Sequence, residues 1–367
     1  MKVAIDARDL ANVITGVARQ VLNLVRYFPE LAPEAEFYLY SDKAITVPFS
    51  HPRLHQQLLT GHRWLWKQLW MPIEQVRSQI DLFYVPSYST PVFNPRKSVV
   101  TIHDMIYTRH PEWTDRLERW RFATIVKHSA RFASRIIAVS ETTRRDILEL
   151  TGISPVKVVV IYPGLDTQFH QVPEIDLTRI ARHLDISDPF VLYVGSLHHR
   201  RNIGRLIQAF AAVKEKLRLP HKLVLSGLNQ FQFSELEQWI ADTQLVNEVL
   251  YFGYVTDEEL VALYNLAEIF VFPSLYEGFG LPVLEAMACG TPVVTSNVSS
   301  LPEVAGDAAI LVDPTSTAEL ATAIERLLTD LPLRHEMIAR GLERCQKFSW
   351  RKAAQDTIAL FREAVSN

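Results

Sequence analysis

The sequence has few cysteines and no long apolar run. Two cysteines, Cys289 and Cys345, are too few for a disulfide framework, and neither has the His and Cys neighbours of a zinc site. The longest uninterrupted apolar run is about five residues, such as 158–162, whereas a helix that spans a bilayer needs roughly 20. Asp6, Arg8 and Asp9 stand where a signal peptide would have its apolar core. We therefore expect a cytoplasmic protein with no transmembrane helix, no bound metal and no resident cofactor.

Glycine and proline are also infrequent, with 13 and 20 of 367 residues, which excludes a collagen-like or low-complexity chain. The length predicts two domains. Net charge is −3, but residues 1–170 hold 21 Lys and Arg against 16 Asp and Glu, while the remainder holds 17 against 25. Such an asymmetry accompanies an acidic partner or a membrane surface, or it reflects a solvated basic face.

Short β-branched runs alternate with longer amphipathic segments along the whole chain. Near-continuous apolar strands separated by helices are typical of parallel sheets covered on both faces, and this pattern occurs twice. The fold class is therefore α/β, with two doubly wound domains at 1–170 and 171–349. Expected strands cover 2–7, 36–40, 81–85, 98–103, 135–139 and 156–162 in the first domain, then 190–194, 222–225, 249–252, 269–272, 292–296 and 309–312 in the second.

The most distinctive segment is 273–292, PSLYEGFGLPVLEAMACGTP. It follows an apolar strand, passes through a glycine-containing loop at 277–280 and enters a helix near Pro282, a favoured first-turn residue. Backbone N–H groups of such a loop and helix start suit a diphosphate. Glu277 lies in the loop, and Glu285 lies about one turn into the helix, where a carboxylate can accept hydrogen bonds from vicinal hydroxyls. Taken alone, the two residues could equally be a helix-start acid and an exposed helix residue.

The whole string resembles the Glu-x7-Glu signature of retaining glycosyltransferases of family 4. The likeness extends to His103-Asp104, the segment 162–166 (YPGLD), Arg200-Arg201-Asn202 and the terminal 348–350 (FSW). This resemblance implies the GT-B architecture, in which two doubly wound domains face a cleft. It also implies that the last helix, about 350–367, crosses back and completes the first domain. The first domain would serve the acceptor and the second would bind a nucleotide-sugar.

The resemblance also implies roles for individual residues. Glu277 would contact the transferred sugar, and Glu285 would hold the donor ribose. The amides of Phe279, Gly280 and Leu281 would meet the donor phosphates.

Two adjacent arginines follow the strand 190–194. Arg200 and Arg201 stand where a phosphate would be met, and charge-assisted contacts stabilise a leaving diphosphate strongly. The family usually has Lys at the second position, so Arg201 is a departure that keeps the charge but replaces a compact ammonium with a planar fork. The alternative is a solvated basic loop.

Three residues of the first half complete the expected site. His103 follows a strand, where it could be a structural cap, but the family places this histidine against the transferred sugar near its 6-hydroxyl. Asp104 would orient His103 or cap the next segment. Gly16 begins a helix where the family has a glycine that lets the backbone approach the donor or acceptor, although a plain loop-to-helix turn also uses glycine.

The segment 63–71 (RWLWKQLWM) interleaves aromatic and basic residues, and Trp66 and Trp70 are spaced to share a helical face. Core packing, a lipid-acceptor groove or contact with an anionic membrane would each produce this pattern. No recognition motif for nucleic acid accompanies it.

The sequence therefore predicts a retaining, metal-independent glycosyltransferase. The expected donor is GDP-mannose, with UDP-glucose next, and the acceptor is a glycan or lipid-linked intermediate of surface polysaccharide synthesis. A dinucleotide-dependent dehydrogenase is excluded because no Gly-x-Gly-x-x-Gly follows the first strand. A catalytically silent carbohydrate-binding scaffold, a sugar-nucleotide epimerase and a glycan phosphorylase remain open alternatives.

Overall fold

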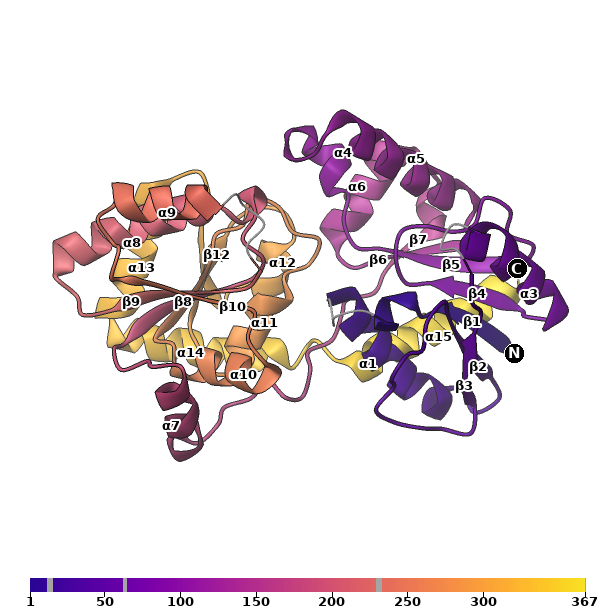
Figure 1. Ribbon diagram of the computed structural model, residues 1–367, viewed down its shortest axis with the longest axis horizontal. Coiled ribbons are helices and arrows are strands. Elements are labelled where there is room, and N and C mark those ends of the chain that lie inside the picture. Colours follow the sequence, from indigo (N-terminus) through magenta and orange to yellow (C-terminus); the bar gives the residue numbers. More distant parts are fainter. Residues whose placement is uncertain (12–15, 62–64, 229–232, 367) are drawn as a thin grey trace. The chain divides into compact units, whose positions relative to one another are not determined.

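The computed structural model describes residues 1–11, 16–61, 65–228 and 233–366 (Figure 1). The chain forms two compact units. Unit 1 contains Met1–Gly164 and Phe348–Asn367, and unit 2 contains Leu165–Lys347. From the sequence, the corresponding boundaries were expected at residues 170 and 349.

Unit 1 is built on a seven-stranded parallel sheet with the order β3-β2-β1-β4-β5-β6-β7. Its strands follow the chain as β1 (Lys2–Asp6), β2 (Glu36–Ser41), β3 (Leu54–Leu58), β4 (Leu82–Val85), β5 (Lys97–Ile102), β6 (Arg135–Ala138) and β7 (Val158–Val160). Its longer helices are α1 (Gly16–Leu31), α3 (Met71–Arg77), α5 (Arg116–Phe132), α6 (Glu141–Thr151) and α15 (Trp350–Ser366), with a short α4 (Ile106–Arg109). The strand order reverses direction between β1 and β4.

Helices cover both faces of this sheet, so both faces are buried. Alternate residues of each strand point to opposite faces and therefore belong to two different apolar clusters. Val3, Ile5 and Tyr84 belong to the apolar cluster that α1 and α15 cover. Ala4 and Phe83 belong to a second cluster, which contains side chains of α3, α5 and α6.

The last helix belongs to unit 1, as the resemblance implied. Helix α15 packs against α1, and both run along the same sheet in Figure 1. The ring of Phe361 lies 5.6 Å from that of Phe28 and 5.2 Å from that of Tyr84. Arg135 also pairs with Glu363 of α15 at 2.7 Å. The chain therefore leaves unit 1, folds unit 2 and returns to complete the first core.

Unit 2 has a six-stranded parallel sheet with the order β10-β9-β8-β11-β12-β13. The strands are β8 (Phe190–Val194), β9 (Lys222–Ser226), β10 (Val249–Gly253), β11 (Ile269–Phe272), β12 (Val293–Ser296) and β13 (Ala309–Val312). The helices are α7 (Glu174–His183), α8 (Ile203–Leu217), α9 (Phe233–Asp242), α10 (Asp257–Leu266), α11 (Leu281–Ala288), α12 (Leu301–Ala305), α13 (Thr317–Thr329) and α14 (Leu331–Cys345). Helices α8 and α13 pack together on one face of the sheet, and α11 and α14 pack together on the other (Figure 1). The order reverses between β8 and β11, and ligands of such sheets bind beyond the carboxyl ends of the strands at this point.

Two details of unit 1 differ from expectation. The edge strand β3 was not predicted, because its sequence LHQQL is half polar and its last three residues are exposed. The segment 63–71, for which the spacing of Trp66 and Trp70 indicated a helical face, contains a π-helical turn (Trp66–Trp70) that leads into α3; residues 63 and 64 lie outside the described residues. Trp66 is fully buried whereas Trp70 is 41% exposed, so the two indoles do not share one environment. No helix within the described ranges has the length and apolarity to cross a membrane.

The return of the chain into unit 1 depends on a glycine. A Cβ atom at Gly164 would lie 2.0 Å from the backbone nitrogen of Trp350, where α15 begins. Because backbone cannot move aside cheaply, we expect Gly164→Ala to lower the free energy of unfolding by roughly 1–3 kcal/mol. Gly16→Ala is the control, since a Cβ there meets nothing within 4 Å. Urea unfolding of both variants checks this, and equal stability of the two variants would contradict it.

Candidate functional site

The candidate site of unit 2 lies where its strand order reverses. The segment after β8 carries Arg200 and Arg201, and the segment after β11 carries Glu277. The two segments are joined through the backbone, because the N–H of Leu275 donates to the carbonyl of Arg200 at 2.8 Å. Parallel strands β8 and β11 are neighbours in the sheet. Arg201 and Glu277, which are 76 positions apart in the chain, therefore meet at the carboxyl ends of these two strands.

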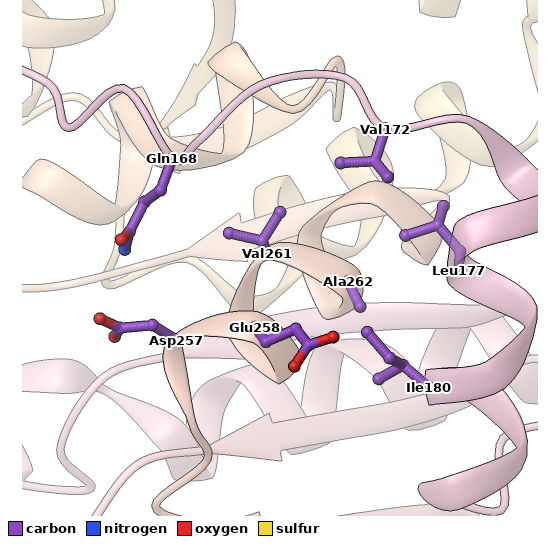
Figure 2. A pocket seen from close by; sticks show the side chains of 8 residues that line it. All are labelled: Gln168, Val172, Leu177, Ile180, Asp257, Glu258, Val261 and Ala262. Atoms are coloured by element: carbon purple, nitrogen blue, oxygen red, sulfur yellow. The ribbon is translucent and has the colours of Figure 1, made fainter.

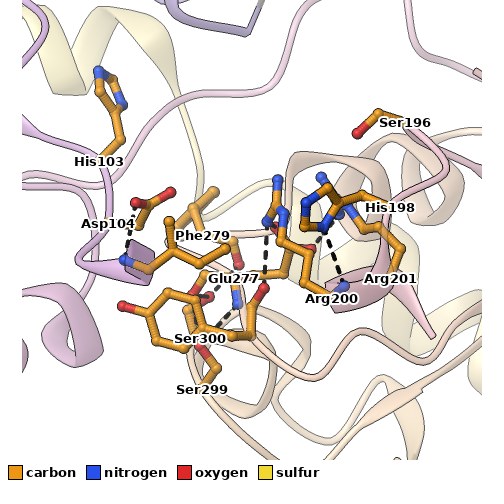
Figure 3. A network of polar contacts seen from close by, with 12 residues as sticks. His103, Asp104, Ser196, His198, Arg200, Arg201, Glu277, Phe279, Ser299 and Ser300 are labelled. Atoms are coloured by element: carbon orange, nitrogen blue, oxygen red, sulfur yellow. Dashed lines mark hydrogen bonds and ion pairs between the residues drawn. The ribbon is translucent and has the colours of Figure 1, made fainter. Parts of the chain in front are cut away.

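The carboxylate of Glu277 is held by both arginines (Figure 3). Arg200 Nη1 donates to Glu277 Oε2 at 2.9 Å, and Arg201 Nη1 donates to Oε1. The Glu277 side chain is 7% exposed, against 20% for Arg200 and 11% for Arg201. A largely buried carboxylate needs such partners, because desolvation disfavours an unpaired charge. The site thus combines a fixed carboxylate with two guanidinium groups.

An aromatic ring contacts Arg201, and the neighbouring Asn202 fixes the segment that carries both arginines. The guanidinium of Arg201 lies 4.9 Å from the ring centre of Phe272, which stacks on Tyr193. Asn202 adopts a left-handed conformation with φ of 62°, which asparagine tolerates better than most residues. Its side-chain amide donates to the carbonyls of Pro273 at 3.2 Å and Pro314 at 2.7 Å. Asn202 therefore ties the arginine segment to the segments after β11 and β13.

Two serines hold the loop that carries Glu277. The backbone N–H of Glu277 donates to Ser299 Oγ at 3.0 Å. The hydroxyl of Ser300 lies 2.9 Å from the carbonyl of Glu277 and 2.6 Å from that of Phe279. No role of Asn202, Ser299 or Ser300 was predicted from the sequence. Ser299 and Ser300 stand directly before Leu301-Pro302, where α12 begins. In the sequence, serines at this position indicate the start of a helix, and nothing in the sequence indicates that they contact a loop 22 residues away.

The loop ends at Gly280, which is the N-cap of α11. Its φ is +114°, a conformation that side-chain-bearing residues rarely adopt, so the backbone here favours glycine. A Cβ there would also lie 2.8 Å from Leu301 Cδ2, so that side chain would have to shift. Helix α11 begins at Leu281, and its first N–H groups have no partner within the helix. Phe279, Gly280 and Leu281 therefore lie beside a positive helix end, where an anion is stabilised.

Glu285 lies in α11 and is 9% exposed. The hydroxyl of Tyr264 donates to its Oε2 at 2.9 Å. Burial, followed by the charge of Glu285, raises the pKa of the neighbouring Cys289 thiol to about 12. Cys289 therefore stays a thiol near neutral pH and is no nucleophile. A carboxylate has about four acceptor sites, so Glu285 can accept from Tyr264 and also from a ligand hydroxyl.

In unit 1, His103 and Asp104 follow β5. His103 Nε2 lies 2.7 Å from the carbonyl of Pro86, which follows β4. A carbonyl only accepts, so Nε2 carries the proton. Burial lowers the pKa of His103, and the imidazole is therefore neutral at pH 7 with its lone pair on Nδ1. Asp104 Oδ1 accepts from the N–H of Ile106 at 3.3 Å at the start of α4. The charge of Asp104 also acts on His103, where it opposes the effect of burial on the pKa.

The remaining predicted residue, Gly16, is the first residue of α1. Among the described residues, no atom lies within 4 Å of a Cβ placed there. The predicted site residues thus fall into two sets, one on each unit. Arg200, Arg201 and Glu277 contact one another in unit 2, whereas His103, Asp104 and Gly16 belong to unit 1.

A pocket of about 350 Å³ also lies in unit 2, between α7 and α10 (Figure 2). Its lining is mostly apolar, and one lining residue, Glu258, pairs with Arg179 at 2.6 Å. None of the predicted site residues lines it. The residues that line it are Gln168, Val172, Leu177, Ile180, Asp257, Glu258, Val261 and Ala262.

Comparison with protein families covers both units. The model of "Glycosyltransferase Family 4" matches residues 14–169, and that of "Glycosyl transferases group 1" matches residues 177–344. The chain belongs to the glycosyltransferases of family 4. The chain is similar to O-antigen chain mannosyltransferase B of Escherichia coli, with 29% identity over 99% of this chain and 100% of that protein. Serotype-specific mannosyltransferase WbdA of Escherichia coli is 33% identical over 64% of this chain, a match that covers only 29% of that longer protein.

Solved structures share the architecture at low identity. Sucrose-phosphate synthase of Thermosynechococcus elongatus superposes with a TM-score of 0.80 at 22% identity, over 100% of this chain and 99% of that chain. HepE of Anabaena, solved with UDP and glucose, has a TM-score of 0.80 at 20% identity, over 99% of this chain and 100% of that chain. The glycosyltransferase thus has the GT-B fold that the sequence predicted.

A double-mutant cycle tests the pairing of Glu277. Arg201→Met leaves the buried carboxylate with one partner fewer, and we expect a loss of roughly 3 kcal/mol in the free energy of unfolding. Adding Glu277→Gln removes the charge that needed the partner, so the double variant loses less than the sum of the single ones. The control is the surface ion pair of Lys216 and Glu325, whose charged groups are 2.8 Å apart. Its expected coupling free energy is below about 1 kcal/mol. Denaturant unfolding measures both cycles, and equal coupling in the two would contradict the assignment.

Proposed function

We propose that this glycosyltransferase transfers a hexose from a nucleoside-diphosphate sugar to a glycan or lipid-linked acceptor, with retention of anomeric configuration. GDP-mannose is the favoured donor and UDP-glucose the next. Relatives named as O-antigen and MMP alpha-(1->4)-mannosyltransferases support the mannosyl donor. Complexes of HepE with UDP and with UDP-glucose support a nucleotide-sugar. The O-antigen relative supports a role in surface polysaccharide synthesis.

The observation that carries the proposal is the contact of Glu277 with Arg200 and Arg201 beside the glycine start of α11. A departing nucleoside diphosphate gains negative charge, and two guanidinium groups with a helix N-terminus stabilise it. Each guanidinium has five N–H donors in a planar fork, and the contact with Glu277 uses Nη1 of each. Diphosphate and carboxylate can therefore share the arginines, with the amides of Phe279, Gly280 and Leu281 as further donors.

Glu277 would then contact the sugar hydroxyls and support the positive charge of an oxocarbenium-like transition state. Retention would follow from substitution on the front face, in which the acceptor attacks from the side of the leaving group. The leaving phosphate takes the proton of the acceptor hydroxyl, and the bond from the anomeric carbon to the phosphate oxygen breaks as the new glycosidic bond forms. This scheme needs no serine, cysteine or lysine nucleophile.

Neutral His103 suits a sugar hydroxyl. With the proton on Nε2 directed at Pro86, Nδ1 can accept a hydrogen bond from the 6-hydroxyl of the transferred hexose. Glu285 would accept from the ribose hydroxyls of the donor. A catalytically silent scaffold, an epimerase and a phosphorylase are separated from the transferase by one assay, because only the transferase moves labelled sugar from a nucleotide donor to an acceptor hydroxyl.

Glutamine variants separate binding from chemistry. We expect Glu285→Gln to weaken nucleotide binding by roughly 10- to 150-fold, which corresponds to the loss of a charge-assisted hydrogen bond of about 1.5–3 kcal/mol. Glu277→Gln should mainly lower turnover, because its carboxylate would contact the reacting sugar rather than the nucleotide. Calorimetric titration with GDP and UDP and initial rates measure the two effects, with Glu325→Gln at the surface as control. Unchanged nucleotide affinity in Glu285→Gln would remove the ribose assignment.

Metal independence follows from the same arginines. If they neutralise the leaving diphosphate, excess EDTA should leave the transfer rate unchanged. The assay uses purified protein with labelled GDP-mannose or UDP-glucose and a membrane extract as the source of acceptor. Loss of activity with EDTA that magnesium or manganese restores would reject this role of Arg200 and Arg201.

A further inference from the structure

Exposed apolar side chains are concentrated in one part of unit 1. Among the described residues, 20 large hydrophobic side chains are exposed, and 11 of them lie between residues 65 and 132. Isolated exposed apolar residues are ordinary, but a contiguous group marks an interaction surface. The most exposed of the 11 are Val92 at 71%, Phe93 at 69%, Trp120 at 65%, Leu117 at 64% and Phe132 at 62%.

Three segments carry these residues, and hydrogen bonds join them. The N–H of Val92 donates to Oε1 of Gln68 in the π-helical turn before α3 at 2.7 Å. The N–H of Thr90 donates to Oγ of Ser129 in α5 at 2.9 Å. The segment 90–93 is therefore linked to the π-helical turn Trp66–Trp70 and to α5. Both helices also contribute to the same apolar cluster, on one face of the sheet.

The outer side of α5 is unusual for a surface helix. Its inward side buries Val126, Ser129 and Ala130. The opposite side, where a globular protein normally has polar residues, presents Leu117 and Trp120 in the first turns and Phe132 at the end. We call the exposed apolar set of the three segments the α5 surface: Leu69, Trp70, Ile73, Val92, Phe93, Leu117, Trp120, Ile125 and Phe132.

Basic residues are interleaved with this apolar set. Helix α5 carries five Arg and Lys residues against one acidic residue, Glu118, which accepts a hydrogen bond from Thr114 at the start of the helix. Unit 1 as a whole holds 24 Lys and Arg against 17 Asp and Glu. The five residues are Arg116, Arg119, Arg121, Lys127 and Arg131.

We infer that the α5 surface docks on an anionic lipid bilayer. Tryptophan and phenylalanine suit the interfacial layer, and arginine and lysine among them are attracted to anionic headgroups. The helix would lie in the plane of the interface rather than cross the membrane. Docking goes beyond the proposed transfer reaction, and it would bring unit 1 to the place where a lipid-linked acceptor resides.

A second copy of the chain fits this surface less well than a bilayer does. A symmetric dimer presents the same patch on both subunits, so the basic residues of one α5 would face those of the other. Such like-charge contacts are unfavourable, whereas the same residues gain energy near anionic lipid.

Vesicle sedimentation of the full-length protein tests the inference. Vesicles of phosphatidylcholine alone are compared with vesicles that also contain phosphatidylglycerol, at low and high salt. We expect binding to the anionic vesicles at low salt, and weaker binding at high salt because the charges are screened. Trp120→Glu should weaken binding by roughly tenfold or more, because the exposed indole that would enter the bilayer interface is lost. Arg121→Ala and Arg131→Ala should each weaken it by about fivefold.

Val246→Glu in unit 2 is the matched control, because Val246 is 67% exposed and the change adds the same carboxylate as Trp120→Glu. Circular dichroism and a GDP or UDP thermal shift on every variant establish that the fold and the nucleotide site remain, so a failure of docking is distinguished from a failure of the proposed transfer. Absence of sedimentation with anionic vesicles at low salt would overturn the inference. Equal binding of Trp120→Glu and Val246→Glu would overturn it as well. A dimer in solution that Trp120→Glu dissociates would show that a second copy covers the surface instead.

Discussion

A buried carboxylate between two arginines is the interaction on which the site of unit 2 depends. Glu277 is removed from water by the packing of its loop, and Arg200 and Arg201 compensate its charge. The same pairing places two guanidinium groups at the reversal point of the sheet, where doubly wound folds bind ligands. In the proposed function, one set of contacts would thus give the site both its stability and its capacity for a diphosphate.

Neighbouring residues keep Glu277 and the two arginines in place through hydrogen bonds to the backbone. Asn202 fixes the arginine segment to two neighbouring carbonyls, and Ser300 fixes the loop of Glu277 at two others. Gly280 then allows α11 to begin directly after the loop, because its φ of +114° is a conformation that other residues rarely adopt. Preorganisation of this kind means that little reorganisation is needed when charge develops during transfer.

The sequence predicted most of the fold because buried parallel strands are continuous apolar runs, and all six strands of unit 2 were located in this way. Strand β3 was missed because its polar residues face solvent at the sheet edge. The Glu-x7-Glu signature indicated Glu277 and Glu285, and the position after the strand 190–194 indicated Arg200 and Arg201. The contact between Glu277 and both arginines could not be predicted, because it joins positions 76 and 77 residues apart. Trp66 and Trp70 show the same limit, since spacing alone does not tell which indole is buried.

The most direct test of the account compares GDP with GMP, and UDP with UMP, in calorimetric titrations of the wild-type protein and of Arg201→Met. If the arginines receive the leaving diphosphate, the diphosphates should bind more tightly than the monophosphates. This advantage should shrink by roughly tenfold or more in Arg201→Met, which loses a charge-assisted contact. An advantage of the diphosphate that is the same in both proteins would contradict the account.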